Sequence, residues 1–233
     1  MNTSVTKSPG TYHHRDLRHA LIDATESLLA ERGADGFSLR EVARRAGVSP
    51  AAPAHHFGDA AGLLTAVVSL AFEGLTQALA AGDARGGRDL RGRLREQGVA
   101  YVEFALRYPG RFRLMFRDRL LADDAGLRQN ANAAFRVLED GVRSAFGVAS
   151  DTPLSGAQWS ALLAIWSLVH GYAHLAIAGR FDWLAGAAGR EAFVEGTLRP
   201  VMDTLIAGIL PGRAGALAPT ARRARVRKGS PYM

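Results

Sequence analysis

The stretch FSLREVARRAGVSPAAPAHHFGD, residues 37–59, decides the fold of the N-terminal part of the chain. Ser38 and Glu41 form an S-x-x-E pattern, which predicts a helix that begins at Ser38 with a capping box. Gly47 ends this helix. Ser49-Pro50 predicts the start of a short third helix, because serine caps helices and proline suits their first position. The stretch therefore predicts two helices separated by a glycine turn.

A further helix precedes this pair. Its apolar residues recur at helical spacing on one face and consist of Leu17, Leu21, Ala24 and Leu28. The helix ends near Gly33, where glycine adopts a left-handed cap at low cost. Helix, capped helix, glycine turn and short helix together predict a helix-turn-helix with a supporting first helix.

The remaining segments also predict helices. Every long segment repeats at three and four residues and none alternates at two, so we expect an all-α protein without strands. A long helix after Asp59 joins two parts. We expect a disordered arm over 1–14, a helix-turn-helix DNA-binding domain over 15–60, a helical ligand-binding and dimerisation domain over 61–210, and a basic disordered tail over 211–233.

Composition excludes several kinds of site. The chain has 233 residues and no cysteine, so it has no disulfide framework, no Cys-ligated metal and no thiol nucleophile. The N-terminus lacks the apolar region of a secretory signal, and a reducing cytoplasm fits the composition. No phosphate-cradling glycine loop, G-x-S-x-G elbow or dinucleotide fingerprint occurs, so we expect neither an enzyme nor a cofactor.

The charge of +7 lies mainly in the tail, where residues 211–233 carry six basic groups and no acid. The high isoelectric point therefore does not by itself indicate that the folded part binds nucleic acid. The tail is either a solvated end or a loose phosphate-binding arm.

Residues 159–179 contain no charged residue. A membrane span is the alternative that we disfavour, because several serines, histidines and glycines make this a poor lipid-facing helix. A helix that is apolar all round is buried on both sides. We assign the bulky side to the core or a cavity and the small side to a dimer interface, which comprises Ala161, Ala164, Leu168, Gly171 and Leu175.

The 37–59 stretch resembles the DNA-binding domain of the tetracycline-repressor (TetR) family, and LIDATESLLAERGADG before it matches that family's first helix. Further on, Trp166 and His170-Gly171 resemble the Trp…His-Gly segment of one C-terminal subgroup. The resemblance implies a homodimeric transcriptional regulator, usually a repressor. A small molecule bound in the C-terminal domain would release it from its double-stranded DNA operator.

The residues support DNA binding independently. Small side chains at the start of the third helix let the backbone approach the major groove and phosphate. Ser38 is placed to donate to phosphate, and Arg40 to reach backbone or base, unless Arg40 and Arg44 only line a solvated face. By the resemblance, His55 and His56 lie where the family often contacts phosphate, with packing or capping as the other role of His56. Our candidate DNA-binding residues are Ser38, Arg40, Ser49, Pro50, Ala51, His55 and His56.

Two residues depart from the family pattern. Ala54 occupies the usual tyrosine position, and Ala60 occupies the usual lysine position at the start of the fourth helix. Both usual residues hold phosphates, which alanine cannot do. A second hypothesis is therefore a small-molecule-binding helical protein whose DNA reader has degenerated.

The helical domain carries bulky residues that suit an apolar effector. The candidate ligand-binding residues are Tyr101, Phe104, Phe112, Met115, Phe116, Trp159, Trp166 and His170, each of which could instead be core. His170 and His174 have the i, i+4 spacing of metal ligands, but HGYAH lacks the glutamate of HExxH and has no evident third ligand, so we expect no metal.

Overall fold

The computed structural model describes residues 10–185 and 189–210, with the side chains of 17–183 and 196–210. The tail predicted over 211–233 lies outside the described residues. No strand occurs in the described part, which confirms the all-α prediction. The helices divide between two compact units, one of residues 1–71 and 110–124, the other of 72–109 and 125–233.

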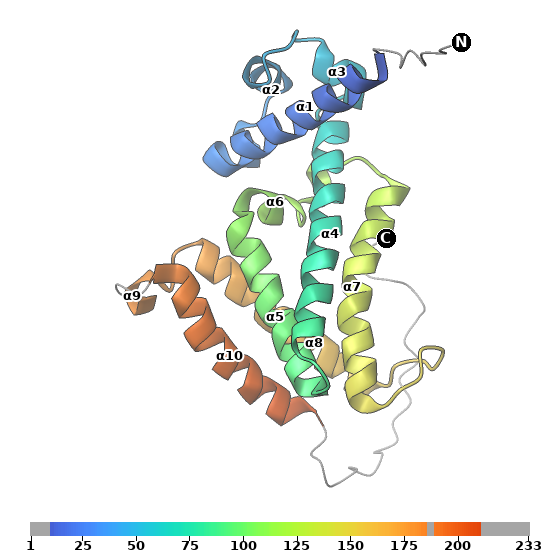
Figure 1. Ribbon diagram of the computed structural model, residues 1–233, viewed down its shortest axis with the longest axis vertical. Helices are drawn as coiled ribbons and strands as arrows, with labels where there is room; N and C mark the ends of the chain where they lie inside the picture. The colour runs from blue at the N-terminus through green and yellow to red at the C-terminus, as the bar shows by residue number, and fades with distance from the viewer. Residues whose placement is uncertain (1–9, 186–188, 211–233) are drawn as a thin grey trace, which may run out of the picture. The chain divides into compact units, whose positions relative to one another are not determined.

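The first unit contains the helix-turn-helix (Figure 1). It comprises α1 (Gly10–Arg32), the 3-10 turn η1 (Ala34–Gly36), α2 (Leu39–Arg45) and α3 (Ala52–Phe57). Because α1 begins at Gly10, residues 10–14 of the arm that we expected to be disordered are helical. Leu21 and Leu28 of α1 and Val42 of α2 are fully buried, so the predicted apolar stripe forms the core.

A segment from later in the chain completes the first unit. It contains most of α6 (Pro109–Leu114) and the 3-10 turn η2 (Asp118–Leu120). Arg111 is ion-paired with Glu26 of α1, and the Arg117 guanidinium lies 2.8 Å from the Asp35 carboxylate. A Cβ on Gly110 would lie 3.0 Å from the Ala30 backbone nitrogen, so the two backbones approach closely.

The second unit is a helical bundle built around α5 (Leu90–Arg107). α5 packs against α7 (Ala125–Phe146), α8 (Gly156–Ile177) and α10 (Gly189–Ile209), and α7 also packs against α8. The short α9 (Asp182–Ala185) precedes α10. Figure 1 shows α5 between its neighbours.

One helix, α4 (Ala60–Arg85), begins in the first unit and ends in the second. It is the long joining helix that the sequence predicts. Its side chains Leu63, Val67 and Leu75 are buried, as their common stripe indicates.

Two helices, α4 and α8, are long and apolar enough to cross a membrane by length and composition. Inside the protein, 50% of the most apolar stretch of α4 is buried, but only 33% of that of α8. Burial therefore accounts for the apolar character of α4 better than for that of α8. Much of the apolar surface of α8 faces outward.

Candidate functional site

The turn between α2 and α3 is fixed by local backbone geometry. Gly47 has φ +68°, the left-handed conformation that side chains disfavour. The Val48 N–H donates to the Ala43 carbonyl at 3.0 Å, which closes the end of α2 in a Schellman pattern. The predicted glycine turn is confirmed, and it sets the direction in which α3 leaves α2.

The start of α3 differs from our prediction. The helix begins at Ala52 rather than at Pro50, because the Ala52 N–H donates to the Ser49 carbonyl at 3.0 Å and makes a turn first. That amide is then not available to a Ser49 side-chain cap. Pro53 is the second residue of the helix, where its missing N–H costs no helical bond.

Most of the candidate DNA-binding residues are exposed. His56 is the exception, since it is half-buried with its ring 6.4 Å from the Phe57 ring and 5.4 Å from the His55 ring. We call the exposed set the reading surface; it consists of Ser38, Arg40, Ser49, Pro50, Ala51 and His55. The chain thus presents small and polar side chains where α2, the turn and α3 meet water.

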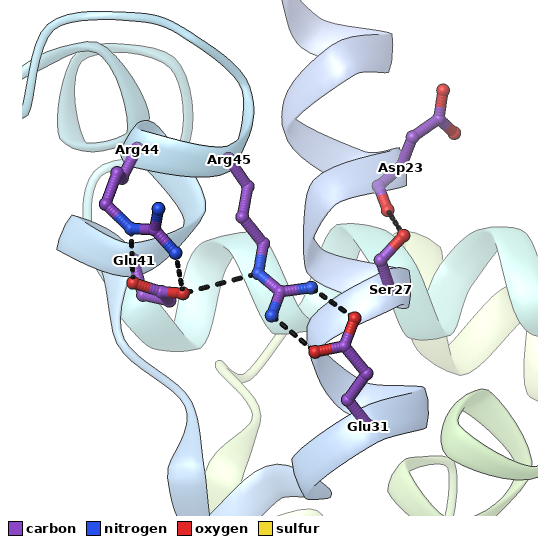
Figure 2. A network of polar contacts seen from close by, with 6 residues as sticks. All are labelled: Asp23, Ser27, Glu31, Glu41, Arg44 and Arg45. Atoms are coloured by element: carbon purple, nitrogen blue, oxygen red, sulfur yellow. Dashed lines mark hydrogen bonds and ion pairs between the residues drawn. The ribbon is translucent and has the colours of Figure 1, made fainter.

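An ion-pair network holds α2 against α1 (Figure 2). The Arg45 guanidinium donates to both carboxylate oxygens of Glu31, at 2.7 and 2.5 Å. Its Nε also lies 3.4 Å from Glu41, which Arg44 contacts at 2.7 and 2.9 Å. Bidentate contacts of this kind fix geometry as well as charge.

The expected capping box at the start of α2 does not form. Ser38 is the N-cap, but its side chain makes no capping hydrogen bond. Glu41 instead points along the helix to two arginines, because charge-assisted bonds to guanidinium are stronger than a bond to a backbone amide. These bonds, first from Arg44 and then from Arg45, lower the pKa of Glu41 to about 2.

The three arginines of α2 differ in whether a carboxylate pairs with them. Arg44 and Arg45 are both neutralised locally, and the Glu41 carboxylate raises the pKa of Arg44. Arg40 is exposed and forms no ion pair with any described residue. Arg40 is therefore the cation of α2 that is best placed to meet a phosphate. The sequence analysis did not foresee the Arg45–Glu31 pair, because the two residues come from different helices.

The start of α4 is set by a cap and a close approach. Asp59 Oδ1 accepts from the Gly62 N–H at 2.8 Å, as predicted for a cap at this position. A Cβ on Gly62 would lie 2.0 Å from the Phe57 carbonyl oxygen, so only glycine fits there. Ala54 and Ala60, the two departures from the family pattern, are both exposed on this part of the surface.

Part of the predicted ligand-binding set comes together on α5 and α8. The Tyr101 hydroxyl lies 2.9 Å from His170 Nδ1, and the Trp166 ring is 6.2 Å from the His170 ring. Phe135 of α7, which the sequence analysis missed, adds a ring 5.9 Å from Trp166. Burial, and next the charge of neighbouring His174, lower the pKa of His170. The ring is accordingly neutral at physiological pH.

Two other ligand-binding candidates, Phe104 and Trp159, also belong to the second unit. Phe104 is 5% exposed and packs 5.3 Å from the Tyr108 ring. Trp159 is half-buried in the first turn of α8. That helix starts with a capping box between Ser155 and Gln158, an S-x-x-Q pattern that the sequence analysis could have used.

The remaining ligand-binding candidates belong to the other compact unit. Phe112 and Met115 are 0% and 3% exposed there, and the Phe116 ring lies 5.3 Å from that of Phe112. These three residues are part of the core that joins the 110–124 segment to the helix-turn-helix unit.

The residues of the predicted dimer face of α8 differ in exposure. Leu175 is 47% exposed, whereas Ala164, Leu168 and Gly171 are half-buried. Ala161 differs, since it is 3% exposed and packed within its own unit. Leu163, which we placed on the core side, is 46% exposed. Because both faces of α8 are apolar, periodicity alone cannot fix its rotation.

α10 also carries small residues with open space around them. A Cβ on Gly171 of α8, or on Gly196 or Gly208 of α10, would meet no atom within 4 Å. Val201 of α10 is 39% exposed. We call this surface the α8–α10 face; it consists of Leu163, Ala164, Leu168, Gly171, Leu175, Gly196, Val201 and Gly208.

No group of three or more histidine or acidic side chains in the described part of the chain is arranged to hold a metal ion. The His170 and His174 rings lie edge to face, with ring centroids 4.6 Å apart.

Two family models match the chain. Residues 21–67 match the bacterial regulatory proteins of the tetR family, and residues 94–200 match the tetracyclin repressor-like C-terminal domain. The chain belongs to the TetR family. The two matches correspond to the helix-turn-helix domain and the C-terminal domain of that family. The Trp166 to Gly171 segment lies within the second match.

Curated relatives of this TetR-family chain are similar over part of its length. The transcriptional regulator BetI of Burkholderia cenocepacia is 39% identical over 82 residues, 35% of this chain and 42% of BetI. BetI of Rhizobium meliloti is 31% identical over 106 residues, 46% of this chain and 43% of that protein. The match thus spans less than half the length of these relatives.

Solved structures are similar over most of the chain. A Rhodococcus protein of unknown function is 32% identical with a TM-score of 0.70, covering 88% of this chain and 100% of its own. A TetR-family regulator from Marinobacter aquaeolei is 18% identical with a TM-score of 0.61, covering 86% and 98%. The second likeness shows the fold alone.

Proposed function

We propose that this TetR-family regulator is a cytoplasmic repressor that binds a palindromic operator as a homodimer and leaves it when a small, mostly apolar effector binds. The observation that carries the proposal is the reading surface, six exposed residues on and between α2 and α3. The Arg45–Glu31 ion pair holds α2, which carries Arg40 of this surface, against α1.

The reading surface divides by chemistry. Ser49, Pro50 and Ala51 are small and let the backbone come close to base edges in the major groove. Ser38 and Arg40 would donate to phosphates, and His55 and His56 would lie beside them. Phosphate contacts set position and register, so the Ser49–Ala51 turn that leads into α3 would carry the sequence preference.

The α8–α10 face supports the dimer. Contiguous exposed apolar residues on a protein surface commonly mark an interface. Its glycines leave room for a second backbone, as close helix packing requires. We propose that two copies pack through this face about a two-fold axis, which a palindromic operator mirrors. Ala161 would support the interface from within its own protomer.

The Tyr101–His170 pair is our candidate for the polar contact of the effector. It is a neutral hydrogen-bonded pair among the rings of Trp166 and Phe135. Such surroundings suit a ligand that is mostly apolar with one polar group. The effector would bind more tightly to a conformation of the dimer in which the two helix-turn-helix units do not match the spacing of the operator half-sites.

The boundaries of this organisation follow the sequence. We propose residues 15–60 as the DNA-binding domain and 61–210 as the ligand-binding and dimerisation domain, with the 110–124 segment associated with the former.

One observation favours a second function. Ala54 and Ala60 are exposed and uncharged where the family resemblance places phosphate contacts. A chain that binds a small molecule but no operator would tolerate these alanines.

Selection of DNA from a random library by the full chain separates the two functions. The proposal expects an enriched palindrome. The variant Ala51→Asp should no longer enrich the palindrome, because a carboxylate on the reading surface repels phosphate. The matched change Ala80→Asp, at an exposed residue of α4, should still enrich it. A reporter gene placed behind the palindrome should be silenced by the wild type. A wild type that enriches no symmetric sequence supports the second function.

A further inference from the structure

Three helices of the second unit meet at one buried carboxylate. Glu96 of α5 is 5% exposed. Arg199 of α10 donates to its Oε1, and the Arg95 Nε lies 3.3 Å from the same oxygen. The Arg85 Nε at the end of α4 lies 3.7 Å from the other oxygen, Oε2. We call Arg85, Arg95, Glu96 and Arg199 the Glu96 cluster.

The cluster is surrounded by further acidic groups. Arg85 also lies 3.5 Å from Glu103, and Arg95 donates to Asp203 of α10 at 2.9 Å. Three arginines and three carboxylates therefore form one connected set across α4, α5 and α10. A buried charge is tolerated only when it is paired and hydrogen-bonded, so removing one partner leaves the others unbalanced.

Backbone contact reinforces the junction. A Cβ on Gly82 of α4 would lie 2.6 Å from the Glu96 carbonyl oxygen. A Cβ on Gly98 of α5 would lie 2.6 Å from the Met202 side chain of α10. α4 and α10 are thus both seated against α5 within one helical turn of Glu96, and small shifts of either helix would break the ion pairs.

The two helices so joined have different tasks under the proposed function. α10 contributes to the α8–α10 face. α4 is one uninterrupted helix from Ala60 to Arg85, and its first turn follows the reading surface directly. The Glu96 cluster therefore lies on the covalent and packed route between the dimer face and the DNA reader.

We infer that the Glu96 cluster is a specificity device that fixes which spacing of operator half-sites the dimer accepts. This inference rests on the proposed function. Residues of the cluster are positioning residues, since they act through α4 and touch no DNA. Holding the end of α4 to α10 limits how far the two readers of a dimer can separate. Each base pair of added spacing also rotates one half-site relative to the other, because a DNA turn takes about 10 base pairs.

The experiment measures spacing preference. The half-site selected by the wild type is built into duplexes with spacers that differ by single base pairs, and the affinity of the full chain is measured for each. Glu96→Gln should lower the ratio of affinities between the best spacing and its neighbours by about threefold or more, leaving the preferred bases of the half-site unchanged. Asp140→Asn is the matched control, because it also replaces a carboxylate by an amide in the second unit, at an exposed residue of α7 outside the connected set.

A second variant guards against loss of folding. Arg85→Gln removes only the link from α4, at a side chain that is 46% exposed, and should flatten the spacing preference in the same direction. An unchanged preference in folded, dimeric Glu96→Gln overturns the inference. If Glu96→Gln does not fold, an unchanged preference in Arg85→Gln overturns it. A flattening as large in Asp140→Asn also overturns it. A wild type that selects no paired half-sites is a failure of the proposed function instead.

Discussion

Arg45 of α2 and Glu31 of α1 form a bidentate ion pair, with Nη1 2.7 Å from Oε1 and Nη2 2.5 Å from Oε2. The pair joins the two helices at the end of α2 that precedes the Gly47 turn. Because Glu41 contacts the same guanidinium, the carboxylates of both α1 and α2 act on Arg45. The orientation of α2 relative to α1, and hence of the reading surface, depends on charges that acid can remove.

Acid should weaken this unit through Glu41. Its pKa is lowered from 4.5 to about 2, first by the hydrogen bond from Arg44, and that of Glu31 is lowered by the bond from Arg45. A group with a depressed folded-state pKa stabilises the fold above its unfolded pKa and loses this contribution as the pH falls. The difference in free energy of unfolding between wild type and Glu41→Gln should thus be largest above about pH 5 and should decrease as the pH falls toward 2.

Urea denaturation at a series of pH values measures that difference. The same decline should appear for Glu31→Gln. A wild-type and Glu41→Gln difference that stays constant across this pH range would show that Glu41 is not held ionised by the arginines.

The α8–α10 face should be sensitive to charge. Gly171→Arg places a guanidinium where the protomer has open space, so the protomer should fold while the dimer loses its apolar contact. Light scattering at micromolar concentration should report a monomer, with loss of binding to a palindrome. Ala80→Arg, on the exposed part of α4, should remain dimeric. A wild-type monomer, or a dimeric Gly171→Arg, contradicts the assignment of this face.

His170 provides a test of the α5–α8 contact. Burial is the first cause of its lowered pKa and the charge of His174 the second. His174→Asn should therefore raise the pKa of His170 but leave it below the ordinary 6.5. Stability should change with pH in the same direction as for Glu41, because a lowered folded-state pKa makes the fold less stable as the pH falls, here through 6.5.

An NMR titration of the imidazole resonances, assigned with His170→Asn, measures this value. If His174→Asn leaves the His170 titration where it was, the two rings are not electrostatically coupled and burial alone accounts for the shift.

Local signals in the sequence predicted most helix ends correctly. Gly33 and Gly47 both have positive φ at the positions where the sequence ends a helix. Glycine predicts such helix ends because its φ preference is a property of the single residue and needs no tertiary partner. The capping box at Ser38 failed for the opposite reason, since Glu41 found two arginines that compete with the cap.

Residues that depend on packing were harder to predict. α8 is apolar on both sides, so the sequence could not decide that Ala161 is buried and Leu163 exposed. Glu96 was missed because its partners Arg85 and Arg199 come from other helices. The eight ligand-binding candidates were chosen for their bulky side chains, which do not show that Phe112 and Tyr101 belong to different compact units.

The alanines at 54 and 60 provide the sharpest test of the reading surface. Both are exposed, Ala54 on α3 and Ala60 as the first residue of α4. Ala54→Tyr with Ala60→Lys should tighten binding to the selected operator without changing the preferred bases, because phosphate contacts position a reader and carry no sequence information. Only the lysine adds a cation, so the slope of log affinity against log salt should steepen by about one unit. The tyrosine should add a gain that salt does not change, and Ala54→Tyr alone separates the two effects.

Fluorescence anisotropy over a range of salt concentrations measures both the gain in affinity and its salt dependence. If the double variant binds no better, or selects a different palindrome, then Ala54 and Ala60 contribute directly to how α3 meets DNA and the phosphate positions inferred from the family do not apply to this chain.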